Sequence, residues 1–142
     1  MAITAKFYPS AAAAMFNSDL NSSDSFKMAL LSSAGTFVAA DTLFSDVSGD
    51  QISASSPNVG YTAGGVAVDV GPATSDGAKA EFPITAALWT GATFTFQNAV
   101  VYETAGGKLL MHLAFDAEQN VAGQDYQINA PSPSPKATPV GI

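Results

Sequence analysis

Alternating apolar and polar residues dominate the chain from Phe26 onward. Successive side chains of a strand point to opposite faces, so each alternating run predicts a half-buried strand. The predicted inward positions are Phe26, Met28, Leu30; Val66, Val68, Val70; Ala78, Ala80, Phe82, Ile84; Phe94, Phe96, Val100, Tyr102; Leu109, Met111, Leu113, Phe115; and Tyr126, Ile128. Turns such as Gly71-Pro72 and Ala105-Gly106-Gly107 separate the runs. The pattern predicts a mainly β fold, a small antiparallel β-sandwich or barrel.

The first twenty residues follow another pattern. Ile3 to Tyr8 alternate weakly, which predicts an arm or an edge strand. An Ala run with high helix propensity follows Pro9, so we expect one short helix from Ser10 to Leu20. Its apolar positions, spaced i, i+3, i+4 and i+8, are Ala12, Met15, Phe16 and Leu20. We therefore divide the chain into an N-terminal arm and helix (1–20), a β-rich body (21–129) and a C-terminal arm (130–142).

Two segments lack strand periodicity. Between Thr36 and Ser48, Asp41 is a candidate cap for one helical turn that carries Leu43, Phe44 and Val47. The Ser-containing stretch from Gly49 to Asn58 predicts a loop. In residues 130–142 four prolines alternate with Ser, Lys and Thr, which is typical of an extended polyproline-like arm.

Composition narrows the function classes. Charged residues make up 12% of the 142 residues, about half the usual share, and the net charge is −7. Five lysines and no arginine cannot build the basic face that nucleic acids or anionic membranes require. No apolar run approaches the ~20 residues of a membrane span. We expect a protein made in the cytoplasm that binds neither nucleic acid nor membrane.

Catalytic candidates are few. His112 is the only histidine, and the candidate orienting partners on neighbouring strands are the carboxylates of Glu103 and Asp125. There is no cysteine and no Gly-x-Ser-x-Gly nucleophile motif. We interpret His112 as a surface or interface histidine, and we expect no enzyme and no cofactor.

Metal and phosphate sites are also disfavoured. Asp41, Asp46 and Asp50 do not have the spacing of an EF-hand loop, so capping and turn formation explain them better than calcium binding. The run Gly60-Tyr61-Thr62-Ala63-Gly64-Gly65 lacks the Gly-Lys-Ser/Thr ending of a phosphate loop and precedes a strand. We expect these glycines to supply positive φ or close backbone approach, and Tyr61 to lie at the core edge with its hydroxyl outward.

An ordered set of segments carries a family resemblance. The set begins with Ser25 to Leu31, continues through the Gly60-Tyr61-x-x-Gly64-Gly65 motif, and includes Leu88-Trp89-Thr90, Ala99 to Tyr102, Leu110 to Phe115 and Gly141-Ile142. Together they cover roughly residues 19–142, and the set resembles small structural proteins from the virion modules of tailed bacteriophages. The Pro-Ser stretch before Val140 departs from that family pattern.

The resemblance implies capsid decoration, in which a cement protein braces the lattice of the major capsid protein. It implies a virion location, contacts with the major capsid protein or other virion proteins, and self-association. Trp89, after the apolar Ala86-Ala87-Leu88, is interpreted as a core or inter-subunit anchor rather than a ligand platform. Trp89, Val140 and Ile142 are the candidate interface residues. The alternatives are a tail, baseplate or fibre-associated component, and a carbohydrate-binding host-recognition module.

Overall fold

The computed structural model describes residues 3–72, 74–75, 80–81 and 84–128. The predicted C-terminal arm, with Val140 and Ile142, lies outside the described residues, as do Ala78 and Phe82. The elements in chain order are β1 (Ile3–Phe7), α1 (Pro9–Phe16), β2 (Phe26–Leu31), the 3-10 turns η1 (Phe44–Asp46) and η2 (Ser48–Asp50), β3 (Val66–Val68), β4 (Thr74–Ser75), β5 (Ala80–Glu81), β6 (Ala87–Glu103) and β7 (Leu109–Ile128).

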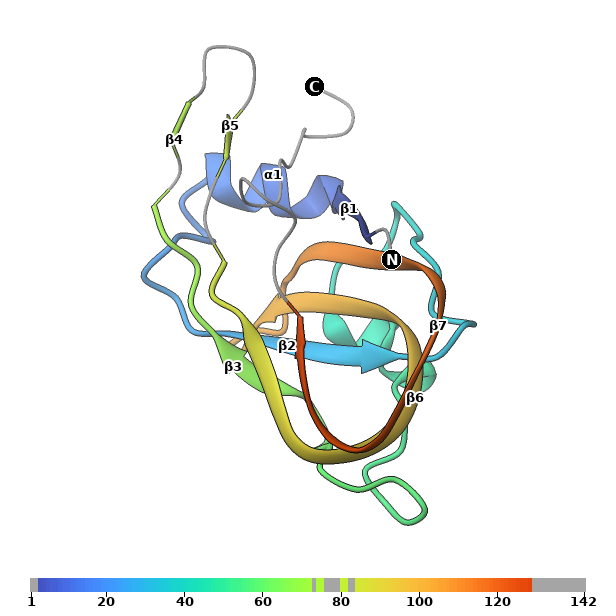
Figure 1. Cartoon of the computed structure of the whole chain (residues 1–142). Helices are drawn as coiled ribbons and strands as arrows, with labels where there is room; N and C mark the ends of the chain where they lie inside the picture. The colour runs from blue at the N-terminus through green and yellow to red at the C-terminus, as the bar shows by residue number, and fades with distance from the viewer. Residues whose placement is uncertain (1–2, 73, 76–79, 82–83, 129–142) are drawn as a thin grey trace.

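The fold is mainly β with one short α-helix, as the alternation predicts. Five strands form one antiparallel sheet in the order β1-β7-β6-β2-β3, and β4 and β5 form a separate two-stranded ribbon. Strands β6 and β7 curve together around the centre of the molecule, so that the sheet folds over onto itself (Figure 1). Aromatic rings of the two paired strands are buried and in contact, such as Phe96 of β6 and Phe115 of β7, whose centroids lie 5.0 Å apart.

The last predicted strand, with Tyr126 and Ile128, is not a separate element. It is the end of β7, which runs for 20 residues against the 17 of β6. Register shifts occur in the β6–β7 ladder, and Gly91 and Gly123 have φ of 53° and 63°. Such irregularities let a strand bend while its pairing continues. Gly91 and Gly123 therefore bend the strands without ending them.

The N-terminal segment is an edge strand. All five residues of β1 pair with β7, from Ile3 opposite Phe115 to Phe7 opposite Met111. Helix α1 then ends at Phe16 rather than at the predicted Leu20, because Asn17 caps it and Ser18 has a φ of 64°.

The predicted apolar face of α1 is partly wrong. Ala11 is the fully buried position and Met15, one turn later, is partly buried against the core. Phe16 follows Met15 by about 100° around the helix, and its side chain is 91% exposed. The face of α1 that packs on the sheet therefore carries Ala11 and Met15 and not Phe16.

The helical turn expected near Asp41 is present as η1, but another residue caps it. The carboxylate of Asp46 accepts hydrogen bonds from the backbone N–H groups of Thr42 and Leu43, each at 3.0 Å. Phe44 stacks on Tyr102 of β6 at 4.1 Å, which fixes this loop to the sheet. No helix of the described chain has the length and apolar character needed to cross a membrane.

Candidate functional site

The Gly60–Gly65 motif forms the sharp approach of the chain to β3. Gly60, Gly64 and Gly65 have φ between 81° and 91°, a region that favours glycine, as expected from the sequence. A Cβ atom on Gly65 would lie 1.8 Å from the backbone oxygen of Met28 in β2. Gly65 therefore allows two backbones to approach more closely than any side chain permits.

Tyr61 points inward, and the expectation of an outward hydroxyl is wrong. The residue is 5% exposed, and its hydroxyl donates to Gln51 Oε1 at 2.7 Å. The same hydroxyl accepts a hydrogen bond from the backbone N–H of Leu30 at 3.2 Å. Burial raises the pKa of Tyr61 to about 12, although the Leu30 hydrogen bond acts in the opposite direction. The phenol is thus a neutral link between β2 and two loops.

Gln51 and Tyr102 complete a polar network around the motif. Gln51 Oε1 also accepts from the backbone N–H of Gly64 at 2.6 Å, and the Tyr102 hydroxyl donates to the Gly64 carbonyl at 2.6 Å. Both backbone groups of Gly64 are therefore bonded to side chains. The sequence did not reveal Gln51, because it lies in a loop without periodicity, ten residues before Tyr61.

Trp89 belongs to the core. It is 1% exposed and packs edge-on against Phe94 at 6.1 Å. Its indole N–H has no hydrogen-bond partner among the described residues. In this fold the ring is not presented to solvent, so Trp89 does not offer the exposed aromatic surface expected of a candidate interface residue.

His112 is buried, and its interpretation as a surface residue is wrong. It is 1% exposed, and its Nε2 lies 2.7 Å from the carbonyl oxygen of Gly35. Phe37 covers the ring at 5.9 Å, and Nδ1 has no hydrogen-bond partner among the described residues. Burial lowers the pKa of His112, the Gly35 hydrogen bond opposes this, and the charge of Lys6 lowers the pKa further.

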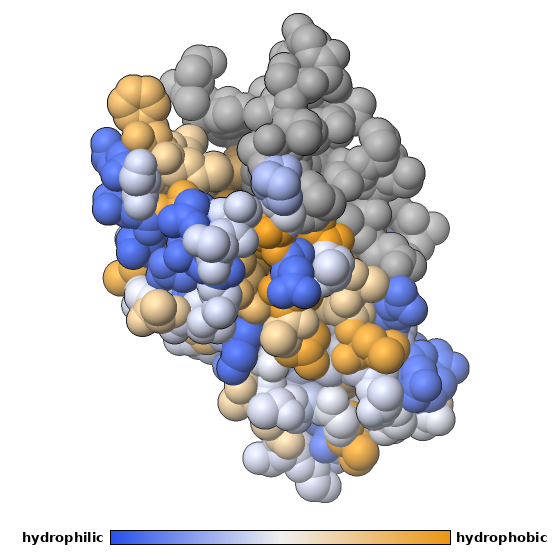
Figure 2. All heavy atoms as spheres, turned by 90° about the vertical axis from the view of Figure 1, so that its left-hand side faces the viewer, coloured by the Kyte–Doolittle hydropathy of each residue, from blue (hydrophilic) through white to orange (hydrophobic). Residues whose placement is uncertain are grey.

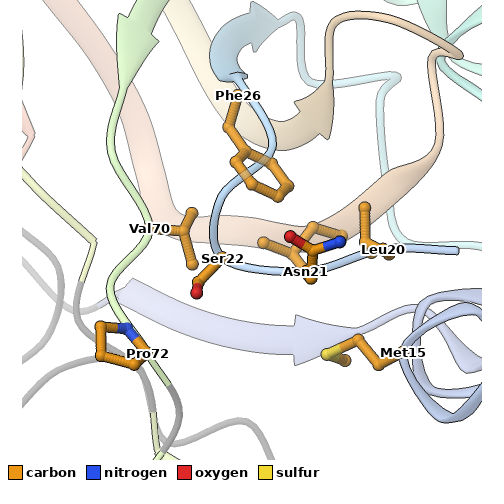
Figure 3. Close-up of a pocket in the computed structure, with 8 residues that line it drawn as sticks. Met15, Leu20, Asn21, Ser22, Phe26, Val70 and Pro72 are labelled. Carbon is orange, nitrogen blue, oxygen red and sulfur yellow. The ribbon is translucent and has the colours of Figure 1, made fainter. Parts of the chain in front are cut away.

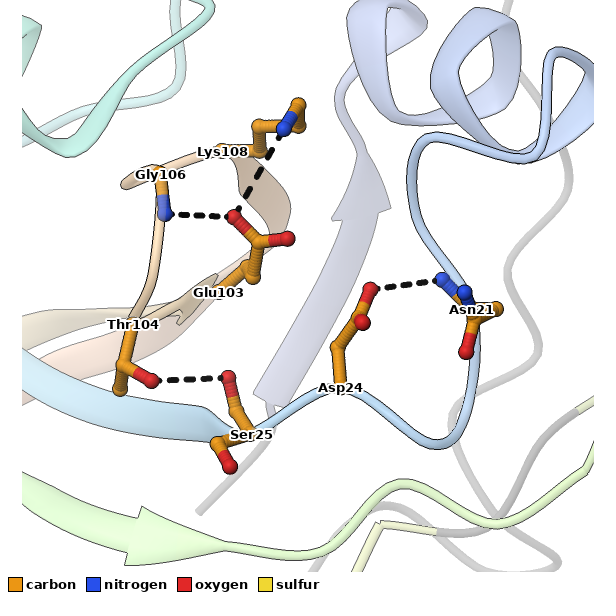
Figure 4. A network of polar contacts seen from close by, with 7 residues as sticks. All are labelled: Asn21, Asp24, Ser25, Glu103, Thr104, Gly106 and Lys108. Atoms are coloured by element: carbon orange, nitrogen blue, oxygen red, sulfur yellow. Dashed lines mark hydrogen bonds and ion pairs between the residues drawn. The ribbon is translucent and has the colours of Figure 1, made fainter.

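Neither carboxylate proposed as a partner of His112 bonds to it. Glu103 Oε1 accepts the backbone N–H of Gly106 at 2.8 Å and lies 3.8 Å from Lys108 Nζ, closing the β6–β7 turn (Figure 4). Asp125 accepts the backbone N–H of Gly91 at 2.8 Å. These carboxylates stabilise turns and bends.

The three aspartates considered for calcium do not form a metal site among the described residues. Asp46 caps η1, and its backbone hydrogen bonds hold the pKa of that carboxyl below its usual value. The pKa of Asp41 is raised by desolvation and by the charges of Asp46 and Asp50. Among the described residues, no group of three or more His, Asp or Glu is arranged to hold a metal ion.

A cavity of about 260 Å³ lies between α1 and the chain that follows β3 (Figure 3). Its apolar walls include Met15, Leu20, Phe26, Val70 and Leu110. Asn21 and Ser22 line it from the loop after α1.

The surface also carries hydrophobic residues, which lie between polar ones on the face shown in Figure 2. Among the residues whose burial is described, the large exposed apolar side chains are Phe16, Val38, Leu43, Val59 and Leu88.

Comparisons with protein-family models, with curated proteins and with solved structures found no match for this chain.

Proposed function

We propose that this protein is a structural component of a tailed-bacteriophage virion, and that it decorates the capsid by bridging subunits of the major capsid protein. The family resemblance over residues 19–142 suggests the virion. The geometry of the described residues adds support for a mechanical role without catalysis. In this role each copy contributes a few contacts, and the many copies on a lattice resist rupture together.

The observation that supports the mechanical role is that three ionisable side chains form hydrogen bonds to backbone groups of the fold. His112 bonds to Gly35, Glu103 to Gly106, and Asp125 to Gly91, so these side chains hold backbone groups in place. A general acid or base must instead reach a substrate from a cleft. The cavity beside α1 has mainly apolar walls and contains none of these residues.

The surface supports attachment through apolar and backbone contacts. With 12% charged residues and no arginine, the chain has few groups for ion pairs with a partner. Phe16 at 91%, Val59 at 56% and Leu88 at 50% exposure instead offer large apolar side chains on separate parts of the surface. Contacts of this kind suit a protein that is held permanently on a lattice.

The copy number in purified virions tests the proposal. Virions of the phage that encodes the chain are digested, and the protein is quantified by mass spectrometry against the major capsid protein. Capsid decoration predicts hundreds of copies per particle. A handful of copies would indicate a tail, baseplate or fibre component, and absence from the particle would overturn the virion proposal.

A further inference from the structure

The chain between β2 and η1 contains a segment without helix or strand, residues 32–42, which we call the strap. Backbone hydrogen bonds fix its two ends. The Ser32 N–H donates to the Asp50 carbonyl at 2.8 Å, and the Thr42 carbonyl accepts from the Leu109 N–H at 3.1 Å. Between these ends, the backbone–backbone hydrogen bonds found among the described residues each join two strap residues. The middle of the strap can therefore move without breaking the ladder of the sheet.

Side chains hold the middle of the strap against the sheet. His112 of β7 donates from Nε2 to the carbonyl oxygen of Gly35 at 2.7 Å, and Gly35 is buried. The ring of Phe37 lies 5.9 Å from the His112 ring and 5.0 Å from the ring of Tyr8. The Tyr8 hydroxyl is buried without a partner among the described residues, and burial raises its pKa, so it stays neutral.

Few charged groups surround His112. On β1, Lys6 pairs with His112 across the ladder, and its Nζ lies 5.3 Å from the centroid of the Phe37 ring. On β6, the residue opposite His112 is the uncharged Val100. Within the strap, Asp41 is the only ionisable residue. The nearest charge from the sheet is therefore positive and disfavours a second positive charge on His112.

Protonation changes the hydrogen bonds that His112 requires. A carbonyl oxygen only accepts, so Nε2 carries the proton of the neutral ring and Nδ1 carries a lone pair. A second proton on Nδ1 creates a buried cation whose new N–H has no acceptor among the described residues. Water reaches Nδ1 when the strap moves away. This movement costs one hydrogen bond and the ring contacts of Phe37, which is less than unfolding the sheet.

We propose that the strap is a pH-sensitive device that opens when His112 is protonated, while the five-stranded sheet stays folded. Opening gives His112 access to water and exposes the ring of Phe37, which is partly buried in the closed strap. The protein thereby presents an additional aromatic side chain to solvent under acidic conditions. The device does not depend on the proposed virion function.

Native-state amide hydrogen exchange of the full chain, followed by NMR, tests the proposal. The Gly35 N–H reports on the strap, because it donates to the Ser32 carbonyl at 3.0 Å within it. The amides of β6, which is paired on both sides, report on the sheet. Protection factors are measured at pH 7.5 and 5.5, each in several low concentrations of urea. His112→Gln keeps a donor for Gly35 and does not titrate, and Asp41→Asn is the matched control, because it removes the ionisable group of the strap and keeps His112.

We expect the Gly35 protection factor to fall by up to about tenfold from pH 7.5 to 5.5, the ratio for a histidine whose pKa is near 6.5 in the open strap. Low urea should leave Gly35 exchange unchanged, because opening the strap exposes little surface. The β6 amides should exchange more slowly and respond to urea. His112→Gln should lose the pH dependence of Gly35 exchange, and Asp41→Asn should keep it.

Three results would overturn the proposal. Gly35 exchange with the rate and urea dependence of the β6 amides would show that the strap opens only when the whole fold does. A Gly35 protection factor that is equal at the two pH values would show that acid does not open the strap. A fall that persists in His112→Gln, or disappears in Asp41→Asn, would assign the response to another group. The wild-type chain alone decides the first two results, whatever the stability of the variants.

Discussion

Tyr61 and His112 are two buried polar rings whose surroundings differ. Tyr61 is 5% exposed, and its hydroxyl has both a donor, Leu30 N–H, and an acceptor, Gln51 Oε1. His112 is 1% exposed, and only its Nε2 has a hydrogen-bond partner, the carbonyl oxygen of Gly35. Its Nδ1 has no partner among the described residues. The Tyr61 hydroxyl therefore both donates and accepts a hydrogen bond, whereas one of the two ring nitrogens of His112 forms a hydrogen bond within the described residues.

The difference separates two ways in which a buried polar group affects stability. The bonds of Tyr61 hold the Gly60–Gly65 turn against β2, so removing the hydroxyl leaves buried groups without partners. His112 can keep its bond to Gly35 while neutral, but a proton on Nδ1 would place a charge among apolar groups without an acceptor. The Tyr61 region is therefore sensitive to substitution, and the His112 region is also sensitive to acid.

Replacing Gly65 by Ala should have the largest effect, because it destroys the approach of β3 to β2 on which the Tyr61 network depends. The added Cβ would lie 1.8 Å from Met28 O, at a φ of 88°. We expect a loss of at least about 4 kcal/mol in the free energy of unfolding, measured by urea denaturation.

Gly91→Ala is the matched control for this substitution. Gly91 also has a positive φ, 53°, but a Cβ there meets no atom within 4 Å. We expect Gly91→Ala to lower the free energy of unfolding by about 1 kcal/mol, because the only unfavourable effect is to place an alanine at a positive φ. Equal losses for Gly65→Ala and Gly91→Ala would contradict the close-approach explanation.

Tyr61→Phe isolates the hydroxyl. The ring is kept, and the Leu30 N–H loses its acceptor while Gln51 loses one donor. We expect a loss of about 1–3 kcal/mol in thermal or urea unfolding. Tyr126→Phe is the comparison, because that hydroxyl is only partly buried and lies 3.3 Å from Gln119. An equal loss in the free energy of unfolding for the two variants would show that the buried hydrogen bonds of Tyr61 stabilise the protein no more than the partly buried one of Tyr126.

His112 should make stability depend on pH. Its pKa is lowered in the folded protein, so the unfolded chain, with a pKa near 6.5, binds more protons below that pH. The stability is present above pH 6.5 and is lost as the pH falls toward the folded-state pKa. The expected loss between pH 7.5 and 5.5 is up to about 1.4 kcal/mol.

Urea titrations across this range, on the wild-type protein and on His112→Gln, measure the effect. Glutamine keeps a donor that can reach Gly35 and cannot titrate. The variant should therefore be less dependent on pH than the wild type between pH 7.5 and 5.5. Parallel pH curves for the two proteins would show that His112 is not the group responsible.

The sequence predicts well where local periodicity determines the structure. The predicted inward residues of β2 and of the segment from Leu109 to Phe115 are buried. The residues between them, such as Ala29, Leu110 and His112, are buried as well, so the alternation did not reveal that both faces of the sheet are covered there. The exposure of Phe16 could not be predicted, since it depends on which side of α1 meets the sheet. The role of Tyr61 was missed in the same way, because its partners Leu30 and Gln51 lie 31 and 10 residues away.

Co-sedimentation with capsids that lack the protein tests the central claim, attachment to the capsid through apolar and backbone contacts, most directly. Salt screens exposed ion pairs and leaves apolar burial intact. A change from low to high sodium chloride should therefore have the smallest effect of the changes considered. We predict that the same fraction of protein sediments with capsids at low and at high sodium chloride. Release at moderate salt, or no binding at either salt concentration, would contradict the account.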